Sequence, residues 1–426
     1  MTMTSTTTTV ARTAIPREPG IDHTLALLKE GYRFIGERCQ AYGSDVFETR
    51  LMMSRVFCVS GEDAARMFYV PDRFTRRGAL PPNALTLLQD YGSAIMLDGA
   101  AHRHRKRLFM SLMQRQSIEH MTRLATEQWR ARMDAWEGMK QVVLHDEVEG
   151  ILCRAACAWA GVELGAGEAR ERTTEFAAMI DGAGSVGARN ARGQMLRAQT
   201  ERWARGLIEG ARDGSLDVAN DCALAIIARH QDENGKALPV NVAAVELINL
   251  LRPTVAVARY ITFAALALHQ NPQYRDGLAA GDDDRLQCFA QEVRRFYPFF
   301  PMVGGRALQP FEWRGHLFLP GDWVLLDLYG TNHDPALWPR PNAFRPERFE
   351  HWDGNAYTLI PQGGGEHDSG HRCAGEFLTI ALIKSLTREL AAMRYVVPRQ
   401  NMWIDLGRLP ALPASRFVMS NVQPAY

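Results

Sequence analysis

Residues 361–376 read PQGGGEHDSGHRCAGE, a glycine-rich loop that runs into a lone cysteine, Cys373, with a strongly apolar helical pattern directly after it. Glycines carry no Cβ and let the backbone approach a flat group closely. A thiol near the start of a helix meets unpaired N–H groups and the positive end of the helix dipole, which favour its thiolate. We therefore expect Cys373 to present a thiolate of lowered pKa to a metal-containing ring. The alternative is a small buried hydrophobic side chain.

Composition and charge narrow the class of protein. The chain has 426 residues, of which 46% are hydrophobic and 23% charged, and its formal net charge is +1. That balance fits a soluble globular protein and gives no global support for nucleic-acid binding. Seven cysteines without a CxxC pair favour a reducing compartment over a disulfide scaffold or a zinc ribbon. We expect a cytoplasmic bacterial protein with a disordered tail over residues 1–20 and one domain over residues 21–426.

Helical periodicity dominates the chain, and strand-like alternation is confined to short stretches such as residues 46–59 and 306–328. The pattern predicts a mainly α protein with a minor β portion. The longest apolar helical run, over residues 240–269, contains Glu246, Arg252 and Arg259. Charges near the centre of a segment argue against a membrane span, so we expect a long central helix of a soluble core.

Three separate signals follow one another toward the C-terminus. Glu292 and Arg295 are three residues apart and share a helix face, Arg348 lies in a Pro-Glu-Arg-Phe segment, and the Cys373 loop comes next. In this order and spacing they resemble the cytochrome P-450 superfamily from about residue 22 onward. The resemblance implies the P-450 fold, haem b with Cys373 as the axial ligand of its iron, and a buried cluster of Glu292, Arg295 and Arg348 that braces the proximal side. The usual Phe seven residues before the cysteine is replaced by Glu366.

The central helix departs from most of the superfamily, because Arg252-Pro253 stands where an acid–alcohol pair is usual. A guanidinium keeps its charge in a protein and needs an anion when it is buried. An acid from another segment could supply it, or Arg252 could reach the surface. The Arg-Pro pair resembles the bacterial fatty-acid peroxygenase branch. This implies that Arg252 holds a substrate carboxylate near the iron, that Pro253 shapes a kink, and that the carboxylate serves as general acid–base for hydrogen peroxide.

Basic residues in the first third of the chain carry the second part of the resemblance. Arg76, His102 and Lys106 match positions that bind the haem propionates in this branch, and His102 and Lys106 share a helix face at four-residue spacing. A solvated basic face is the alternative for the His-Arg-His-Arg-Lys run. We expect Arg103 and Arg105 of this run to lie on the surface.

The residues above the haem set the product. Ile95 aligns with a position that is often Gln or His in the branch, and it offers no proton donor, so we also weigh plain core packing for it. Phe299 is expected to pack near the substrate, or simply in the core. A carboxylate anchored by Arg252 brings the α and β carbons to the oxidant. We expect α-hydroxylation as the main outcome, with β-hydroxylation and decarboxylation to a terminal alkene left open.

The sequence thus predicts a hydrogen-peroxide-dependent peroxygenase that hydroxylates long-chain fatty acids and requires no redox partner. Two alternatives remain at this stage. Thr254, which follows Pro253, could serve as the alcohol of a conventional monooxygenase that uses dioxygen and a reductase. A non-catalytic protein that binds haem or fatty acid is the third hypothesis.

Overall fold

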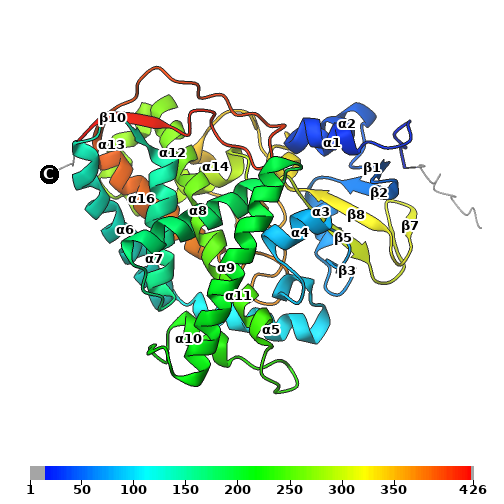
Figure 1. The fold of residues 1–426 in the computed structure, drawn as a ribbon. Helices are drawn as coiled ribbons and strands as arrows, with labels where there is room; N and C mark the ends of the chain where they lie inside the picture. The colour runs from blue at the N-terminus through cyan, green and yellow to red at the C-terminus, as the bar shows by residue number, and fades with distance from the viewer. Residues whose placement is uncertain (1–14, 424–426) are drawn as a thin grey trace, which may run out of the picture.

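The computed structural model describes residues 15–423, and it confirms a mainly α fold with small β-sheets (Figure 1). The α-helices are α1 Thr24–Glu30, α2 Phe34–Tyr42, α3 Glu62–Phe68, α4 Pro82–Leu88, α5 Gly99–Leu112, α6 Arg115–Glu137, α7 Leu144–Trp159, α8 Ala166–Gly182, α9 Ala188–Asp213, α10 Ala223–Arg229, α11 Val240–Ala256, α12 Ala258–Gln270, α13 Arg275–Ala279, α14 Asp283–Phe296, α15 Leu328–Asn332 and α16 Glu376–Ala392. Short 3-10 helices are η1 Gly31–Arg33, η2 Ala94–Met96, η3 Pro272–Tyr274 and η4 Pro346–Phe349.

The strands form three small sheets. They are β1 Val46–Leu51, β2 Ser54–Val59, β3 Phe74–Thr75, β4 Val142–Val143, β5 Met302–Ala307, β6 Phe311–Trp313, β7 His316–Phe318, β8 Trp323–Asp327, β9 Arg394–Val396 and β10 Val418–Gln423. The largest sheet has the order β1-β2-β8-β5-β3, in which only the β2–β8 pair is parallel. The second has the order β4-β10-β9, and β6 and β7 form a hairpin. The five-stranded sheet lies to one side of the molecule and the helices fill the other (Figure 1).

The start of the described chain differs from the predicted tail. Residues 1–14 lie outside the described residues, whereas residues 15–20, also assigned to the tail, run beside β1. Glu18 N donates to the Glu48 carbonyl at 2.8 Å, and Glu48 N donates to the Pro16 carbonyl at 2.8 Å. The edge strand β1 thus offers free backbone groups that pair with this segment. Sequence composition carries no signal for such pairing.

The predicted central helix is two helices, α11 and α12, which meet at Val257. Pro253 lies one turn before the break and removes the N–H that would continue the helical hydrogen-bond ladder. The most apolar 18-residue window of the combined segment Val240–Gln270 has a mean hydropathy of 1.4, which a membrane helix would also have, but 72% of that window is buried inside the protein. It therefore serves as the core helix, and α7, α12, α14 and α16 contribute to the same hydrophobic core.

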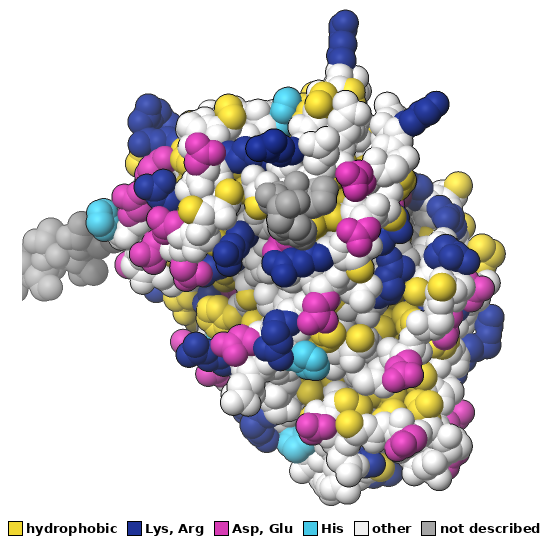
Figure 2. All heavy atoms as spheres, turned by 90° about the vertical axis from the view of Figure 1, so that its left-hand side faces the viewer, with side chains coloured by type: hydrophobic (Ala, Val, Ile, Leu, Met, Phe, Trp, Pro, Cys, Tyr) yellow, Lys and Arg dark blue, Asp and Glu magenta, His cyan; other side chains and the backbone are white. Residues whose placement is uncertain are grey.

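One face of the molecule shows how its charges are distributed. In Figure 2, Lys and Arg side chains alternate with Asp and Glu over the face near the C-terminus, and hydrophobic side chains lie between them. No broad field of one sign covers this face. The pattern agrees with the formal net charge of +1.

Candidate active site around Cys373 and Arg252

Cys373 lies in the loop that leads into α16, three residues before the helix begins at Glu376. Its N–H donates to the Gln362 carbonyl at 3.2 Å, and Gln362 Nε2 donates to Sγ at 3.7 Å. The predicted lowering of the pKa is wrong for the thiol by itself. Burial, followed by the charge of Glu376, raises the pKa of Cys373 more than the cationic Lys106 lowers it. A coordinated metal deprotonates a thiol outright, so this pKa does not oppose metal ligation.

A second charged group, which the sequence analysis missed, lies beside Cys373. Glu376 accepts from Arg294 Nη2 at 2.6 Å and from Arg372 Nε at 2.6 Å. The two guanidinium groups outweigh burial and hold the pKa of Glu376 at about 2. Arg294 Nε also donates to Gln362 Oε1 at 3.2 Å and so fixes the amide whose other end reaches Cys373. The i,i+4 spacing of Arg372 and Glu376 was the available signal.

The structure brings Glu292, Arg295 and Arg348 together in the interior. Arg295 donates two hydrogen bonds to Glu292, from Nε to Oε2 at 2.7 Å and from Nη2 to Oε1 at 2.8 Å. Arg348 Nε lies 3.1 Å from Glu292 Oε2. Arg295 also donates to the Asn332 carbonyl at 2.9 Å, and Arg345 N donates to Glu292 Oε1 at 2.7 Å. Buried charges that are paired and hydrogen-bonded in this way tie α14 to the loops before the Cys373 segment.

Arg76, His102 and Lys106 also lie together and are buried, and His371 of the cysteine loop completes the group, which we call the basic cluster. The His102 and His371 rings stack with centroids 3.8 Å apart. Burial, then repulsion from Lys106, lowers the pKa of His102 to about 4. Burial lowers the pKa of Lys106 to about 8 and that of Arg76 as well. His371 was not singled out from the sequence, although it lies two residues before Cys373.

Polar atoms of the basic cluster remain without partners. Within residues 15–423, His102 Nδ1 and Nε2, His371 Nδ1 and Arg76 Nε have no hydrogen-bond partner, and the cluster forms no ion pair with an acid. Its other hydrogen bonds go to carbonyls, from Arg76 to Gly304 at 2.7 Å and from Lys106 to Arg372. Buried cations that meet only neutral groups are costly. The cluster is therefore suited to carboxylates supplied by a bound molecule.

The expectation for Arg105 is wrong, whereas Arg103 is exposed as predicted. Arg105 is buried and pairs with the fully buried Glu246 at 2.8 Å, Nη1 to Oε1. His102, Arg105 and Lys106 share the inward face of α5 because their spacing follows the helical repeat. The partner of Arg105 is 141 residues away in sequence, so no local pattern could have indicated it.

Arg252 lies in the interior of α11 with its side chain 3% exposed. Its Nη1 donates to the Leu87 carbonyl at 2.6 Å, and its Nη2 donates to the Leu88 carbonyl and, at 3.4 Å, to Asn249 Oδ1. No Asp or Glu of residues 15–423 forms an ion pair with it. Burial, then repulsion from Arg197, lowers its pKa to about 9. Arg252 is thus a desolvated cation that has neutral partners and no counter-ion.

Three accessible residues form a stripe along the otherwise buried C-terminal half of helix α11. Asn249 and Ala256 are half-buried and Pro253 is exposed, whereas the residues between them are buried. Their spacing of four and three residues places them on one helix face. Tyr260, four residues beyond Ala256, lies close enough to Cys373 for the thiolate charge to contribute to the raised pKa of its phenol, after burial. Cys373 is itself half-buried, so the stripe and the thiol both keep accessible surface.

Ile95 and Phe299 lie on separate segments beside the central helices. Ile95 is half-buried in η2, whose first N–H, that of Ala94, donates to Glu246 Oε1 at 2.8 Å. Phe299 stacks on Tyr260 with ring centroids 4.3 Å apart, close to the break between α11 and α12. The side chain of neither residue carries a proton donor.

These features can be tested against haem. One half-buried thiol offers a single axial ligand, and the basic cluster offers two cations without an acidic partner, Arg76 and Lys106, and two imidazoles with unpaired ring nitrogens to bind two carboxylates. Among residues 15–423, no three His, Cys, Asp or Glu side chains gather as a metal-ligand group, so the donor set does not compete with a single thiolate ligand. The residues fit iron protoporphyrin IX, and fold and site together define a haem-thiolate protein.

Comparison with known proteins agrees. The cytochrome P-450 family profile matches residues 286–387. The solved structure of cytochrome P-450SP alpha with (R)-ibuprofen is 46% identical, with a TM-score of 0.93, over 96% of this chain and 100% of that chain. Cytochrome P-450EX alpha with myristic acid is 38% identical, with a TM-score of 0.92, over 97% and 100%. A variant of cytochrome P-450 OleT with arachidonic acid is 34% identical, with a TM-score of 0.93, over 97% and 99%. The chain belongs to the cytochrome P-450 family.

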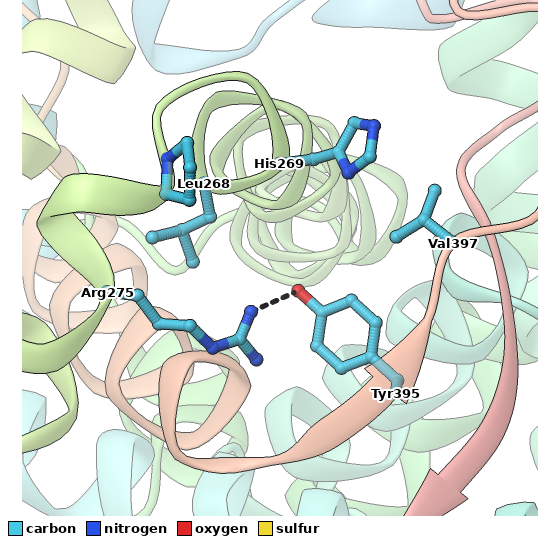
Figure 3. A pocket seen from close by; sticks show the side chains of 6 residues that line it. Leu268, His269, Arg275, Tyr395 and Val397 are labelled. Carbon is cyan, nitrogen blue, oxygen red and sulfur yellow. Dashed lines mark hydrogen bonds between the residues drawn. The ribbon is translucent and has the colours of Figure 1, made fainter.

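A surface pocket of about 210 Å³ lies apart from this site, at the C-terminal end of α12 (Figure 3). Arg275 and Tyr395 face each other across it, and Arg275 Nη1 donates to the Tyr395 hydroxyl at 3.4 Å. Arg275 also donates to the Leu390 and Met393 carbonyls, so its guanidinium is already used to hold the end of α16. None of the residues selected from the sequence lines this pocket.

Proposed function

We propose that the protein is a hydrogen-peroxide-dependent peroxygenase that hydroxylates long-chain fatty acids, mainly at the α carbon. The observation that carries the proposal is Arg252, a buried guanidinium without an acidic partner in the described chain. A carboxylate supplied by the substrate completes its charge, because arginine binds carboxylates through paired, fixed-geometry hydrogen bonds. The three ligands of the solved relatives, ibuprofen, myristic acid and arachidonic acid, are all carboxylic acids.

The haem is held by residues of this chain in defined roles. Cys373 is proposed as the axial ligand, and Arg76, His102, Lys106 and His371 as the partners of the propionates. Thiolate-ligated haem iron, when bound, supplies cleavage of the peroxide O–O bond and the oxidising equivalent that reacts with a C–H bond. The overall reaction balances as a fatty acid and hydrogen peroxide giving a 2-hydroxy acid and water.

Arg252 is proposed to bind the substrate carboxylate and to position the α carbon. It fixes the carboxylate next to the accessible stripe of α11, and the α carbon is attached directly to that carboxylate, which favours reaction there. Pro253 contributes shape, since it lies on the stripe one turn before the break between α11 and α12. The bound carboxylate takes a proton from one peroxide oxygen and returns it to the departing one, so no side chain of the helix has to do so. Neither Ile95 nor Phe299 provides a proton, and both are proposed to pack against the alkyl chain.

A conventional monooxygenase is the second candidate, and it requires Thr254 as the alcohol that relays protons. Thr254 is buried, and its hydroxyl donates to the Leu250 carbonyl at 2.8 Å within the helix. The hydroxyl's proton is thus already committed to the backbone, which favours the peroxide route.

The test compares oxidants with the purified haem protein. We expect conversion of myristic acid to 2-hydroxymyristic acid with hydrogen peroxide alone, detected by mass spectrometry. Product that forms only with a reduced nicotinamide cofactor and a reductase would establish the monooxygenase instead. Tight fatty-acid binding without product under either condition would establish a binding protein. All seven cysteines are free thiols, which agrees with the proposed reducing, cytoplasmic setting.

A further inference from the structure

The tip of the β1–β2 hairpin has an unusual composition for its geometry. Leu51 and Ser54 are register partners, so Met52 and Met53 alone form the turn. Both have positive φ, 49° and 61°, and both are exposed, by 47% and 63%. Two-residue turns with positive φ at both positions strongly prefer Asn-Gly, since side chains strain this conformation. The chain thus displays two large apolar side chains where a less strained turn was available.

Side chains at the start of α1 and just before it hold this turn in place. Asp22 Oδ2 accepts from Met53 N at 2.7 Å, and Thr24 Oγ1 accepts from Met52 N at 2.6 Å. Hydrogen bonding from the Thr24 side chain, followed by that from Met53 N, lowers the pKa of Asp22. Both backbone donors of the turn are therefore occupied, and the methionines are presented in a fixed position.

The same hydrogen bonds bring further exposed apolar side chains close to the Met52-Met53 turn. Ile21 is 74% exposed and Leu25 is 82% exposed, and they flank the two residues that hold the turn. We call Ile21, Leu25, Met52 and Met53 the apolar tip. Single exposed apolar residues are ordinary on protein surfaces, whereas a contiguous group indicates an interaction site.

Basic residues stand directly behind the apolar tip. Arg50 and Arg55 are register partners across β1 and β2, and both are exposed. Like charges at opposed positions destabilise a strand pair. Arg55 is partly neutralised by Asp322 at 2.6 Å, whereas Arg50 forms no ion pair within residues 15–423. Lys29 lies one turn beyond Leu25 and is exposed as well. An apolar tip with a basic collar complements the interface of an anionic bilayer.

The apolar tip also borders a surface pocket beside α4, the helix whose last carbonyls accept hydrogen bonds from Arg252. This pocket, of about 310 Å³, is lined by Met52, Leu80, Pro81, Leu85 and the exposed Tyr91, among others. Leu85 belongs to α4, and the carbonyls at the end of α4, those of Leu87 and Leu88, are the groups that Arg252 binds. The seven-residue helix is about 10 Å long. An alkyl chain can span that distance.

We propose that the apolar tip and its basic collar dock the enzyme on an anionic lipid surface, from which long-chain fatty acids enter the pocket beside Met52. Docking on the lipid surface depends only on the apolar tip and its basic collar. Entry of fatty acids through the pocket rests on the proposed function as well.

The test uses the haem-loaded full chain and vesicles of phosphatidylcholine with or without phosphatidylglycerol. The double variant Met52→Asn with Met53→Gly removes the apolar side chains and supplies the preferred turn, so we expect its unfolding temperature to be unchanged or higher. Its partition onto mixed vesicles should fall by about tenfold or more, since it loses the two exposed methionine side chains that would be buried in the bilayer. Val396→Asn, at an exposed apolar position of β9, is the matched control and should bind like the wild type.

The contribution of the basic collar is measured separately, as the added binding that phosphatidylglycerol gives. Arg50→Ser should remove most of the added binding that phosphatidylglycerol gives, and high salt should do the same to the wild type. Wild-type protein that stays in solution with both vesicles, or a double variant that binds like the wild type, would overturn the proposal. Loss of self-association in sedimentation velocity, without loss of vesicle binding, would assign the tip to a second copy and overturn it too. Wild-type turnover of water-soluble octanoic acid with peroxide tests the proposed function separately, because no lipid surface is involved.

Discussion

Replacing Arg252 with alanine is expected to remove most fatty-acid turnover while leaving a folded protein. The side chain is a desolvated cation with carbonyl and amide partners only. A substrate carboxylate would add two charge-assisted hydrogen bonds, each worth roughly 1.5–3 kcal/mol. Their loss corresponds to roughly a 10²- to 10⁴-fold decrease in kcat/KM.

The effect on stability should be much smaller. Arg252→Ala leaves the Leu87 and Leu88 carbonyls without a donor, at a cost of about 1–3 kcal/mol each when a polar group is stranded in the interior. It also removes a buried charge that has no counter-ion, which offsets this cost. We therefore expect the thermal unfolding midpoint to move by a few degrees only.

Arg259 is the matched control. It lies two turns further on, in α12, is buried to the same extent, and has Nε and Nη1 without hydrogen-bond partners among residues 15–423. Unlike Arg252 it has an acid nearby, with Nη2 3.7 Å from Asp181 Oδ1. The assay is peroxide-driven hydroxylation of myristic acid, together with an absorption titration of the haem with the acid. An equal loss in Arg259→Ala, or an Arg252→Ala enzyme within a few fold of the wild type, would refute the reasoning.

Three further outcomes are expected. Lys106→Ala should lower haem content measured by the pyridine haemochrome assay, while Arg103→Ala on the exposed side of α5 should not, and equal losses would contradict the basic cluster. Asn249→Asp places a carboxylate where Oδ1 lies 3.4 Å from Arg252 Nη2, so it should raise the KM for fatty acids by roughly tenfold or more through competition, and an unchanged KM would count against a free guanidinium. Burial raises the pKa of Asp327 to about 7, so its folded carboxyl stays protonated while the unfolded one ionises above 3.8. Stability from this group is therefore full at low pH and is lost as pH rises toward about 7, by at most about 4 kcal/mol. The unfolding midpoint of wild type relative to Asp327→Asn should fall over that range, and a constant difference would contradict the assignment.

The sequence predicted those parts of the site that rest on local spacing or on a long apolar pattern. Glu292 and Arg295 are i,i+3 neighbours on one helix, and the structure joins them in the interior. The lack of a local acidic partner for Arg252 was also predicted, because no acid occurs within a helical turn of it in the sequence. Such features need no knowledge of how distant segments pack.

Features that depend on distant packing were predicted less well. Arg105 was placed on the surface because its partner Glu246 comes from another helix. The pKa of Cys373 was expected to fall, but burial outweighs the helix end and the nearby cations. His371 belongs to the basic cluster because the cysteine loop packs against α5, where its ring stacks on that of His102. In each case the deciding contact is made in three dimensions and leaves no periodic signal.

The central claim is that the substrate's carboxylate supplies the charge that Arg252 lacks. The most direct measurement compares myristic acid with its methyl ester, an uncharged analogue of the same alkyl chain, under hydrogen peroxide and the same enzyme. We expect 2-hydroxymyristic acid from the acid, and turnover of the ester that is lower by roughly 10²-fold or more. Equal turnover of the ester at the same carbon would contradict it.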